Sequence, residues 1–320
     1  MMWTDALLDA KRHRGDPLAD AVIAEVFAKG EREAVNTLMN SLVRNDGLPP
    51  EQLPQVVRDY LAQTSAIPIA DPELVRQGEQ IFGTYGPEML MVLGFYSLPA
   101  SYAAKKGVQV LYRTAYLLQR PVRRVFETTQ MVVDVMAPGG LEAHGRGVRT
   151  AQKVRLMHAA IRHLTLHDPA QPWDLAGLGV PINQEDLAGT LMTFSFVVME
   201  GLERLNIQLS AAERAAYLHA WQVIGRIMGI DEDLIPATVA DAETLTATIR
   251  RRQIGASLEG QQLTAALIDG MQSLMPSLTP GLAGSMVHHF LDNDPFQHQN
   301  VAAMLGVPPA NWTLHLVHLI

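Results

Sequence analysis

The residues with the clearest potential for chemistry lie on one predicted helix, from about residue 145 to about residue 166. Counting in threes and fours from His158 places Arg155 and Arg162 on the same stripe as small and aliphatic side chains. Burying an imidazole between two guanidinium groups is costly unless each polar group has a partner. A bound anionic cofactor would supply one, whereas a hydrogen-bonded structural histidine is the simpler alternative.

The helix that precedes this stripe carries a second candidate group. It is predicted over residues 121–136, and Arg124 and Thr128 share one of its faces because they are four residues apart. A buried arginine that satisfies helix ends is the competing interpretation. Helical periodicity continues along the rest of the chain and strand-like alternation is almost absent, so the sequence predicts an all-α fold.

Other segments are expected to support these two helices. Two short helices before residue 30, separated by Gly15-Asp16-Pro17, are assigned a packing role. A long helix is expected over residues 184–206, with Asn183 and Asp186 capping and bracing its first turn.

The composition limits the classes of protein to consider. Hydrophobic residues make up 48% of the 320 residues and charged residues 18%, which favours a large core or an apolar cavity. No apolar run reaches the roughly 18 residues that a membrane-spanning helix needs. The N-terminus carries no basic segment followed by an apolar run, so we expect a soluble, cytoplasmic protein.

Charge and cysteine content exclude further chemistry. The absence of cysteine rules out disulfides, thiolate-bound metals, iron–sulfur clusters and cysteine nucleophiles. A formal net charge of −8 argues against nucleic-acid binding, and the arginine cluster over residues 120–124 is too short to overturn this. His163 and His167, four residues apart, could share a zinc ion, although a solvated helix face is the plainer explanation.

Three segments carry a resemblance to a known family. They are Val-Arg-Leu-Met-His-Ala-Ala-Ile-Arg over residues 154–162, the run over residues 179–195 that contains Asn183, and the run over residues 213–225. Together they resemble the latex-clearing-protein family, which contains rubber oxygenases and MpaB-like oxygenases. The similarity covers about residues 75–240.

The resemblance implies a globin-like core that holds a b-type haem. A chain of 320 residues could form one large helical domain or two packed halves, and we expect one all-α domain over residues 1–320. The core would span residues 75–240, with N-terminal helices over 1–70 and C-terminal helices over 241–320 packing on it. The flanking parts show no recognisable match of their own.

The resemblance also implies roles for individual residues. His158 falls on the proximal iron ligand, and Arg155 and Arg162 are placed to meet haem propionates. Arg124 and Thr128 match the catalytic distal pattern, but Glu127 stands where the family has a lysine. The region around residues 106–110 offers no carboxylate, although rubber-cleaving members use a distal glutamate there.

The function implied is a haem-dependent oxygenase that uses O2 on an apolar, unsaturated, isoprenoid- or lipid-like small molecule. Its pocket would be walled by residues such as Met131 and Val135. A haem sensor or carrier without turnover, and a haem-free protein that binds hydrophobic ligands, are the alternatives. No nucleic acid and no integral membrane span are expected, and a homodimer is left open.

Overall fold

The computed structural model of the chain describes residues 2–30, 53–65, 71–114, 116–274, 280–292 and 300–309. Across these ranges the secondary structure is helical, and the only β pairing is an isolated bridge between Ala104 and Ile254. The all-α prediction is therefore confirmed. Helical periodicity also predicts helices over 31–44 and 308–319, which fall wholly or largely outside the described residues. None of the described helices combines the length and apolarity of a membrane span.

The chain divides into two compact units, and neither is a single stretch of sequence. Unit 1 comprises Met1–Gly83, Gln130–Ala188 and Ala215–Ala237, and unit 2 comprises Thr84–Thr129, Gly189–Arg214 and Thr238–Ile320. A single domain over residues 1–320 stays a prediction.

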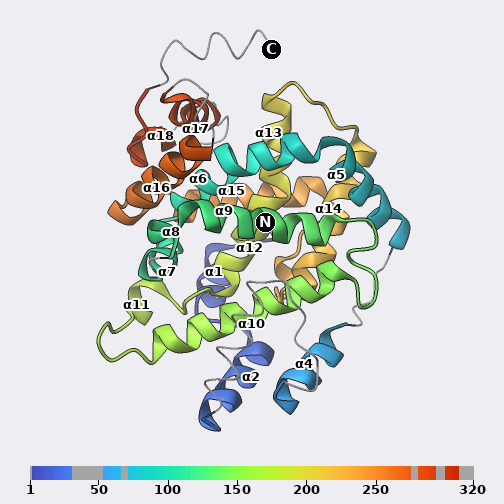
Figure 1. The fold of residues 1–320 in the computed structure, drawn as a ribbon, viewed down its shortest axis with the longest axis vertical. Coiled ribbons are helices and arrows are strands. Elements are labelled where there is room, and N and C mark those ends of the chain that lie inside the picture. The colour runs from blue at the N-terminus through green and yellow to red at the C-terminus, as the bar shows by residue number, and fades with distance from the viewer. Residues whose placement is uncertain are drawn as a thin grey trace. The chain divides into compact units, whose positions relative to one another are not determined.

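The helices can be followed along the chain in Figure 1. Unit 1 contains α1 (Asp5–Arg12), α2 (Pro17–Ala28), α4 (Gln55–Ser65), α10 (Arg146–Leu166), α11 (Leu175–Leu178) and the 3-10 turn η3 (Glu232–Leu234). Unit 2 contains the π-helical turn η2 (Leu93–Ser97), α6 (Leu98–Tyr102), α7 (Val108–Arg113), α8 (Tyr116–Gln119), α13 (Phe196–Arg204), α15 (Val239–Gln253), α16 (Leu258–Leu274), α17 (Leu282–Asp292) and α18 (Val301–Met304). Four helices have residues in both units: α5 (Pro72–Val92), α9 (Pro121–Met136), α12 (Gln184–Phe194) and α14 (Ala211–Ile227).

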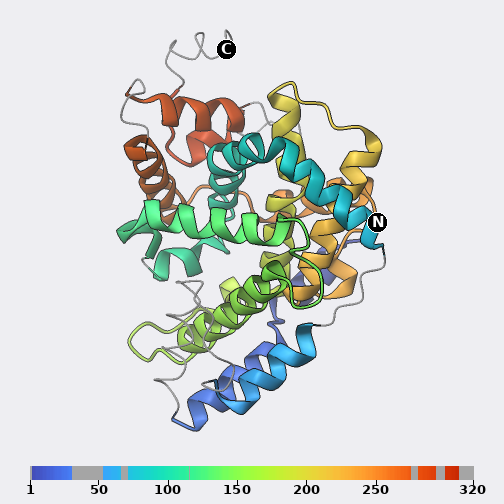
Figure 2. The ribbon, with the colours of Figure 1, turned by 45° about the vertical axis from the view of Figure 1, so that its right-hand side comes forward.

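The core of unit 1 forms where α10 packs on α2 and α4, which lie side by side (Figure 2). From α10 this core takes Leu156, Ala159 and Ala160, which are at most 1% exposed. The two alanines allow the helices to approach closely, and Val22 and Tyr60 fill the space from α2 and α4. One side of α10 is thus buried against α2 and α4.

The start of α10 is joined to the end of α9 by a buried carboxylate. Asp134 is 1% exposed and accepts a hydrogen bond from Thr150 Oγ1 at 2.8 Å. Arg146 Nε lies 2.8 Å from the other oxygen of the same carboxylate. Gly147 lets the two backbones meet, because a Cβ there would lie 2.6 Å from Val135 Cα and 2.7 Å from Asp134 O.

Gly147→Ala is therefore expected to lower the free energy of unfolding by about 1–3 kcal/mol, as overpacking does elsewhere. Thermal unfolding measures the change. The matched control is Gly83→Ala in α5, where a Cβ meets no atom within 4 Å and alanine favours the helix. Equal midpoints for the two variants would contradict the close approach.

The prediction of one long helix over residues 184–206 is wrong in one respect, because the helix breaks at Ser195. That residue has φ −106° and ψ −84°, and it separates α12 from α13. Its buried hydroxyl donates to Leu191 O at 2.7 Å, a bond that competes with the helical ladder. The predicted cap is confirmed, since Asp186 N donates to Asn183 Oδ1 at 3.0 Å.

Unit 2 contains a buried charged group. The turn η2 contacts α6, α13 and α17, and it supplies Tyr96, which is 1% exposed. Arg250 on α15 donates to both oxygens of Glu200 on α13, at 3.2 and 2.8 Å, and to Tyr96 Oη at 3.0 Å. These three side chains tie together elements that are far apart in the sequence.

Candidate functional site

His158 lies on the side of α10 opposite the core formed with α2 and α4. Val154, Met157 and Ile161 share this side by helical spacing, and all four side chains are half-buried. The Nδ1 atom of His158 is buried. An imidazole among aliphatic side chains on one helix face could hold the metal of a flat, apolar cofactor.

Arg155 is held by a carboxylate from the N-terminal segment. Its Nε and Nη2 donate to the two oxygens of Asp16 at 2.5 and 2.8 Å, and Nη1 donates to Ile227 O at 3.2 Å. Its guanidinium also lies 5.9 Å from the centre of the Tyr60 ring. Burial acts to lower the pKa of Arg155, but the bonds and charge of Asp16 outweigh it and raise that pKa.

Arg162 has a parallel arrangement one helical turn beyond His158. Nη1 is bonded to Asp20 on α2, Nε donates to Pro181 O at 2.9 Å and Nη2 donates to Ile182 O at 2.8 Å. Arg162 is 3% exposed. Burial raises the pKa of the Asp20 carboxyl, while the charge of Arg162 acts in the opposite direction.

The two arginines, for which a bound anion was expected as a partner, each have a partner within the chain. The anions are carboxylates of the same chain, because α2 brings Asp16 and Asp20 against α10. Contact of either arginine with a haem propionate stays a prediction. The guanidinium group would have to make that contact in addition to its bond with Asp16 or Asp20.

The zinc alternative finds no support in the described part of the chain. The rings of His163 and His167 stack with centroids 4.2 Å apart, and Phe27 stacks on His163 at 4.6 Å. His167 Nδ1 is engaged with His163 O at 2.8 Å. No group of three or more potential ligands that could hold an ion occurs among the described residues.

The environment of His163 leads us to expect that the stability of the protein decreases in acid. Burial, and then the neighbouring His167, lower the pKa of His163 below 6.5, while the Asp20 charge acts to raise it. His163 therefore binds a proton more readily in the unfolded chain than in the folded one. The contribution of the neutral imidazole to stability is fully present above pH 6.5 and is lost as the pH falls through the lowered pKa. We expect His163→Phe, which keeps the stacking, to weaken this dependence in thermal melts from pH ~8 to ~5. Parallel pH profiles for the two proteins would contradict the assignment.

Arg124 and Thr128 belong to the part of α9 in unit 2. Arg124 Nη1 lies 3.8 Å from Glu127 Oε2, and Glu127 also accepts from Arg123 Nε at 3.0 Å. Thr128 Oγ1 donates to Arg124 O at 3.0 Å. Burial raises the pKa of Tyr102 on α6, which keeps its phenol neutral, although the charge of Arg124 acts against this shift.

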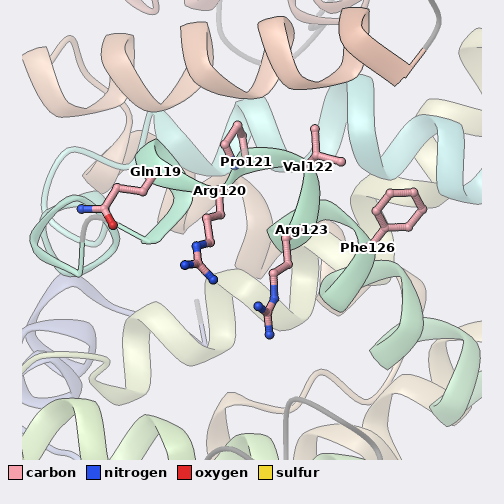
Figure 3. Close-up of a pocket in the computed structure, with 6 residues that line it drawn as sticks. All are labelled: Gln119, Arg120, Pro121, Val122, Arg123 and Phe126. Carbon is pink, nitrogen blue, oxygen red and sulfur yellow. The ribbon is translucent and has the colours of Figure 1, made fainter.

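A shallow hollow of about 530 Å³ lies at the start of α9 (Figure 3). It is lined by Gln119, Arg120, Pro121, Val122, Arg123 and Phe126. Neither Arg124 nor Thr128 lines it. The two residues expected to wall a substrate pocket lie further along α9, where Val135 is fully buried and Met131 is half-buried.

Sequence reasoning missed the acidic partners of the two arginines. Asp16 was visible only as the residue before Pro17, where it caps α2 by accepting from Ala19 N at 3.3 Å. Asp20 lies in the first turn of the same helix, where acidic residues are common. Both signals have local explanations, so nothing in the pattern indicated contacts with residues about 140 positions away.

Comparison with known proteins identifies the family. Residues 84–317 match the family model described as ER-bound oxygenase mpaB/B'/Rubber oxygenase, catalytic domain. The chain belongs to this family. It is therefore an enzyme of an oxygenase family, and α9, α10 and α12 all fall inside the matched region.

Two relatives extend the match. The chain is 30% identical over 283 residues to a rubber oxygenase of Streptomyces sp. (strain K30), covering 87% of this chain and 69% of that protein. The chain also matches a solved structure of latex clearing protein LCP in the closed state, with a TM-score of 0.82 and 27% sequence identity. The match covers 97% of this chain and 82% of the LCP chain. The likeness thus extends beyond residues 75–240, where the sequence motifs placed it.

Proposed function

We propose that this chain is a haem-dependent oxygenase that uses O2 to cleave a carbon–carbon double bond in an apolar isoprenoid- or lipid-like molecule. The observation that carries the proposal is His158, which lies on a half-buried aliphatic face of α10 in a member of an oxygenase family. The named rubber oxygenase relative supports an alkene as the substrate class.

His158 is the residue that would hold the haem iron, and a bound haem would supply the activation of O2. Val154, Met157 and Ile161 would exclude water from that face of the cofactor. The proposed reaction balances without a reductant, because the carbon–carbon double bond and the O–O bond break while two carbonyl bonds form. Both oxygen atoms end in the products.

Arg124 is proposed to stabilise negative charge that builds up on the reacting oxygen atoms, since its guanidinium is a permanent donor. Thr128 would have to redirect the hydroxyl proton that it now donates to Arg124 O. Glu127 supplies only acceptor oxygens where the family pattern has a lysine. In this chain the cationic character of that helix turn therefore comes from Arg123 and Arg124.

The test is an absorbance spectrum of the full chain expressed with ample haem, followed by dithionite reduction and CO. A Soret band that shifts with CO is expected. O2 uptake is then measured with squalene and with polyisoprene latex, and carbonyl products formed under labelled O2 should carry the label. A haem protein that consumes no O2 with either alkene would support a sensor or carrier, and absence of a Soret band after haem addition would support the haem-free alternative.

A further inference from the structure

We propose that Asp16 and Asp20 are positioning residues for His158, so that the N-terminal segment forms part of the oxygenase site. This inference rests on the proposed function, because it assumes that His158 holds the haem iron. The segment precedes residue 84, where the match to the family's catalytic domain begins. It is the source of both carboxylates that hold the arginines on either side of His158.

The first contact holds α10 before His158. Arg155, three residues earlier, forms a two-point bond with Asp16, whose side chain is 5% exposed. Its guanidinium lies against the backbone of Gly229, where φ is +78° and a Cβ would come within 2.5 Å of Arg155 Cζ. No other residue type fits there without moving the arginine.

The second contact holds α10 after His158. Arg162, four residues later, is bonded to Asp20 and packs against Gly15, where a Cβ would lie 3.0 Å from Arg162 Cδ. Its other donors reach the carbonyls of Pro181 and Ile182. Ile182 has φ +51°, a strained value for a β-branched residue, and the bond from Arg162 helps to hold it.

Together the two contacts set the rotation of α10. Arg155 and Arg162 are seven residues apart, about 10.5 Å along the axis, and they share one stripe with His158 between them. Each contact adds a fixed point to the packing of α10 on α2 and α4, and one such point constrains the rotation and tilt of the helix less than two. Two contacts on the same stripe define the direction in which the imidazole leaves the helix.

The N-terminal segment that supplies the acids is itself anchored in unit 1. Lys11 lies 2.7 Å from Asp231, and Arg12 lies 3.1 Å from Glu185 and 3.0 Å from Asp186. These bonds reach the start of α12 and the chain beside η3. Asp16 and Asp20 therefore project from a support fixed on two further elements.

The experiment uses the full chain with Asp16→Asn and Asp20→Asn. Asparagine keeps the shape and can still cap α2, so the change removes mainly the charge. We expect the haem-loaded variants to lose haem to excess apomyoglobin about tenfold faster than the wild type, as removal of supporting groups around a metal ligand does. The iron–histidine stretching band of the reduced protein is expected to shift. Asp20→Glu, which keeps the charge, should remain close to wild type.

The matched control is Glu232→Gln, which removes the charge that pairs with Arg226 in the same unit, on a carboxylate 70% exposed. It should leave haem transfer and the band unchanged. Thermal melts of the haem-free proteins separate the roles, because a purely structural part for the acids would lower the midpoint without moving the band. If Asp16→Asn yields no folded protein, the test rests on Asp20→Asn. The Asp20 side chain is 35% exposed, so its substitution should be tolerated by the fold.

The outcomes also separate this inference from the proposed function. A wild-type protein that never takes up haem overturns both. A wild type with a Soret band, together with variants that hold haem as long and give the same band, overturns the positioning role and leaves the oxygenase proposal standing.

Discussion

Replacing His158 by alanine is expected to abolish the Soret band of protein purified with haem. The imidazole is the proposed protein ligand of the iron, and its loss would remove the bond that keeps the cofactor in place. Since removal of outer supporting groups already costs about 10- to 100-fold in metal affinity, loss of the ligand should exceed about 100-fold. Haem bound per chain, measured by the pyridine haemochrome spectrum, gives the result.

The matched control for this substitution is His163→Ala on the same helix. His163 is engaged in ring stacking with Phe27 and His167, so its loss should leave haem content unchanged. Imidazole added to His158→Gly is expected to restore part of the Soret band, because the free base can occupy the space left by the side chain. A full Soret band in His158→Ala would refute the ligand assignment.

Replacing Glu200 by glutamine is expected to lower the free energy of unfolding by about 3–5 kcal/mol, the usual cost of removing one partner of a buried ion pair. Glu200 and Arg250 are 6% and 8% exposed, so the arginine charge would remain in the interior without its counter-charge. Tyr96 offers Arg250 a hydroxyl oxygen at 3.0 Å and not a second carboxylate. Urea unfolding followed by circular dichroism measures the loss.

A more exposed pair in the same unit provides the comparison. Glu203 is bonded to Arg214 with 39% of its side chain exposed, and Glu203→Gln should cost less than about 1 kcal/mol because water replaces the lost interaction. The double variant Glu200→Gln with Arg250→Met should recover part of the stability, since it leaves no uncompensated charge. Equal costs for Glu200→Gln and Glu203→Gln would show that burial does not govern the group around Tyr96.

The departures from the family pattern bear on the reaction more than on the cofactor. Glu127 lies beside Arg123 and Arg124, so this turn of α9 combines one carboxylate with two guanidinium groups. The proposed iron ligand does not depend on these residues, because His158 is on another helix. The proposed haem binding and the proposed alkene cleavage can therefore be tested independently, by the absorbance spectrum and by O2 uptake.

Local pattern was enough to predict the helices that carry the candidate site. Helical periodicity predicted α9 and α10 almost to the residue, and Asn183 was predicted as a cap. The motif around His158 pointed to the family that the comparisons show. These features depend on residues within a few turns of one another, so the sequence by itself determined them.

Only the tertiary structure decided what the polar groups contact. Arg155 and Asp16 are 139 residues apart and Arg162 and Asp20 are 142 apart, so helical periodicity carries no information about either pair. The break at Ser195 was likewise hidden, because whether a serine hydroxyl bonds to its own helix or to another group depends on what the fold places around it. A buried charge takes whichever partner the packing brings near, and that choice is made by the fold as a whole.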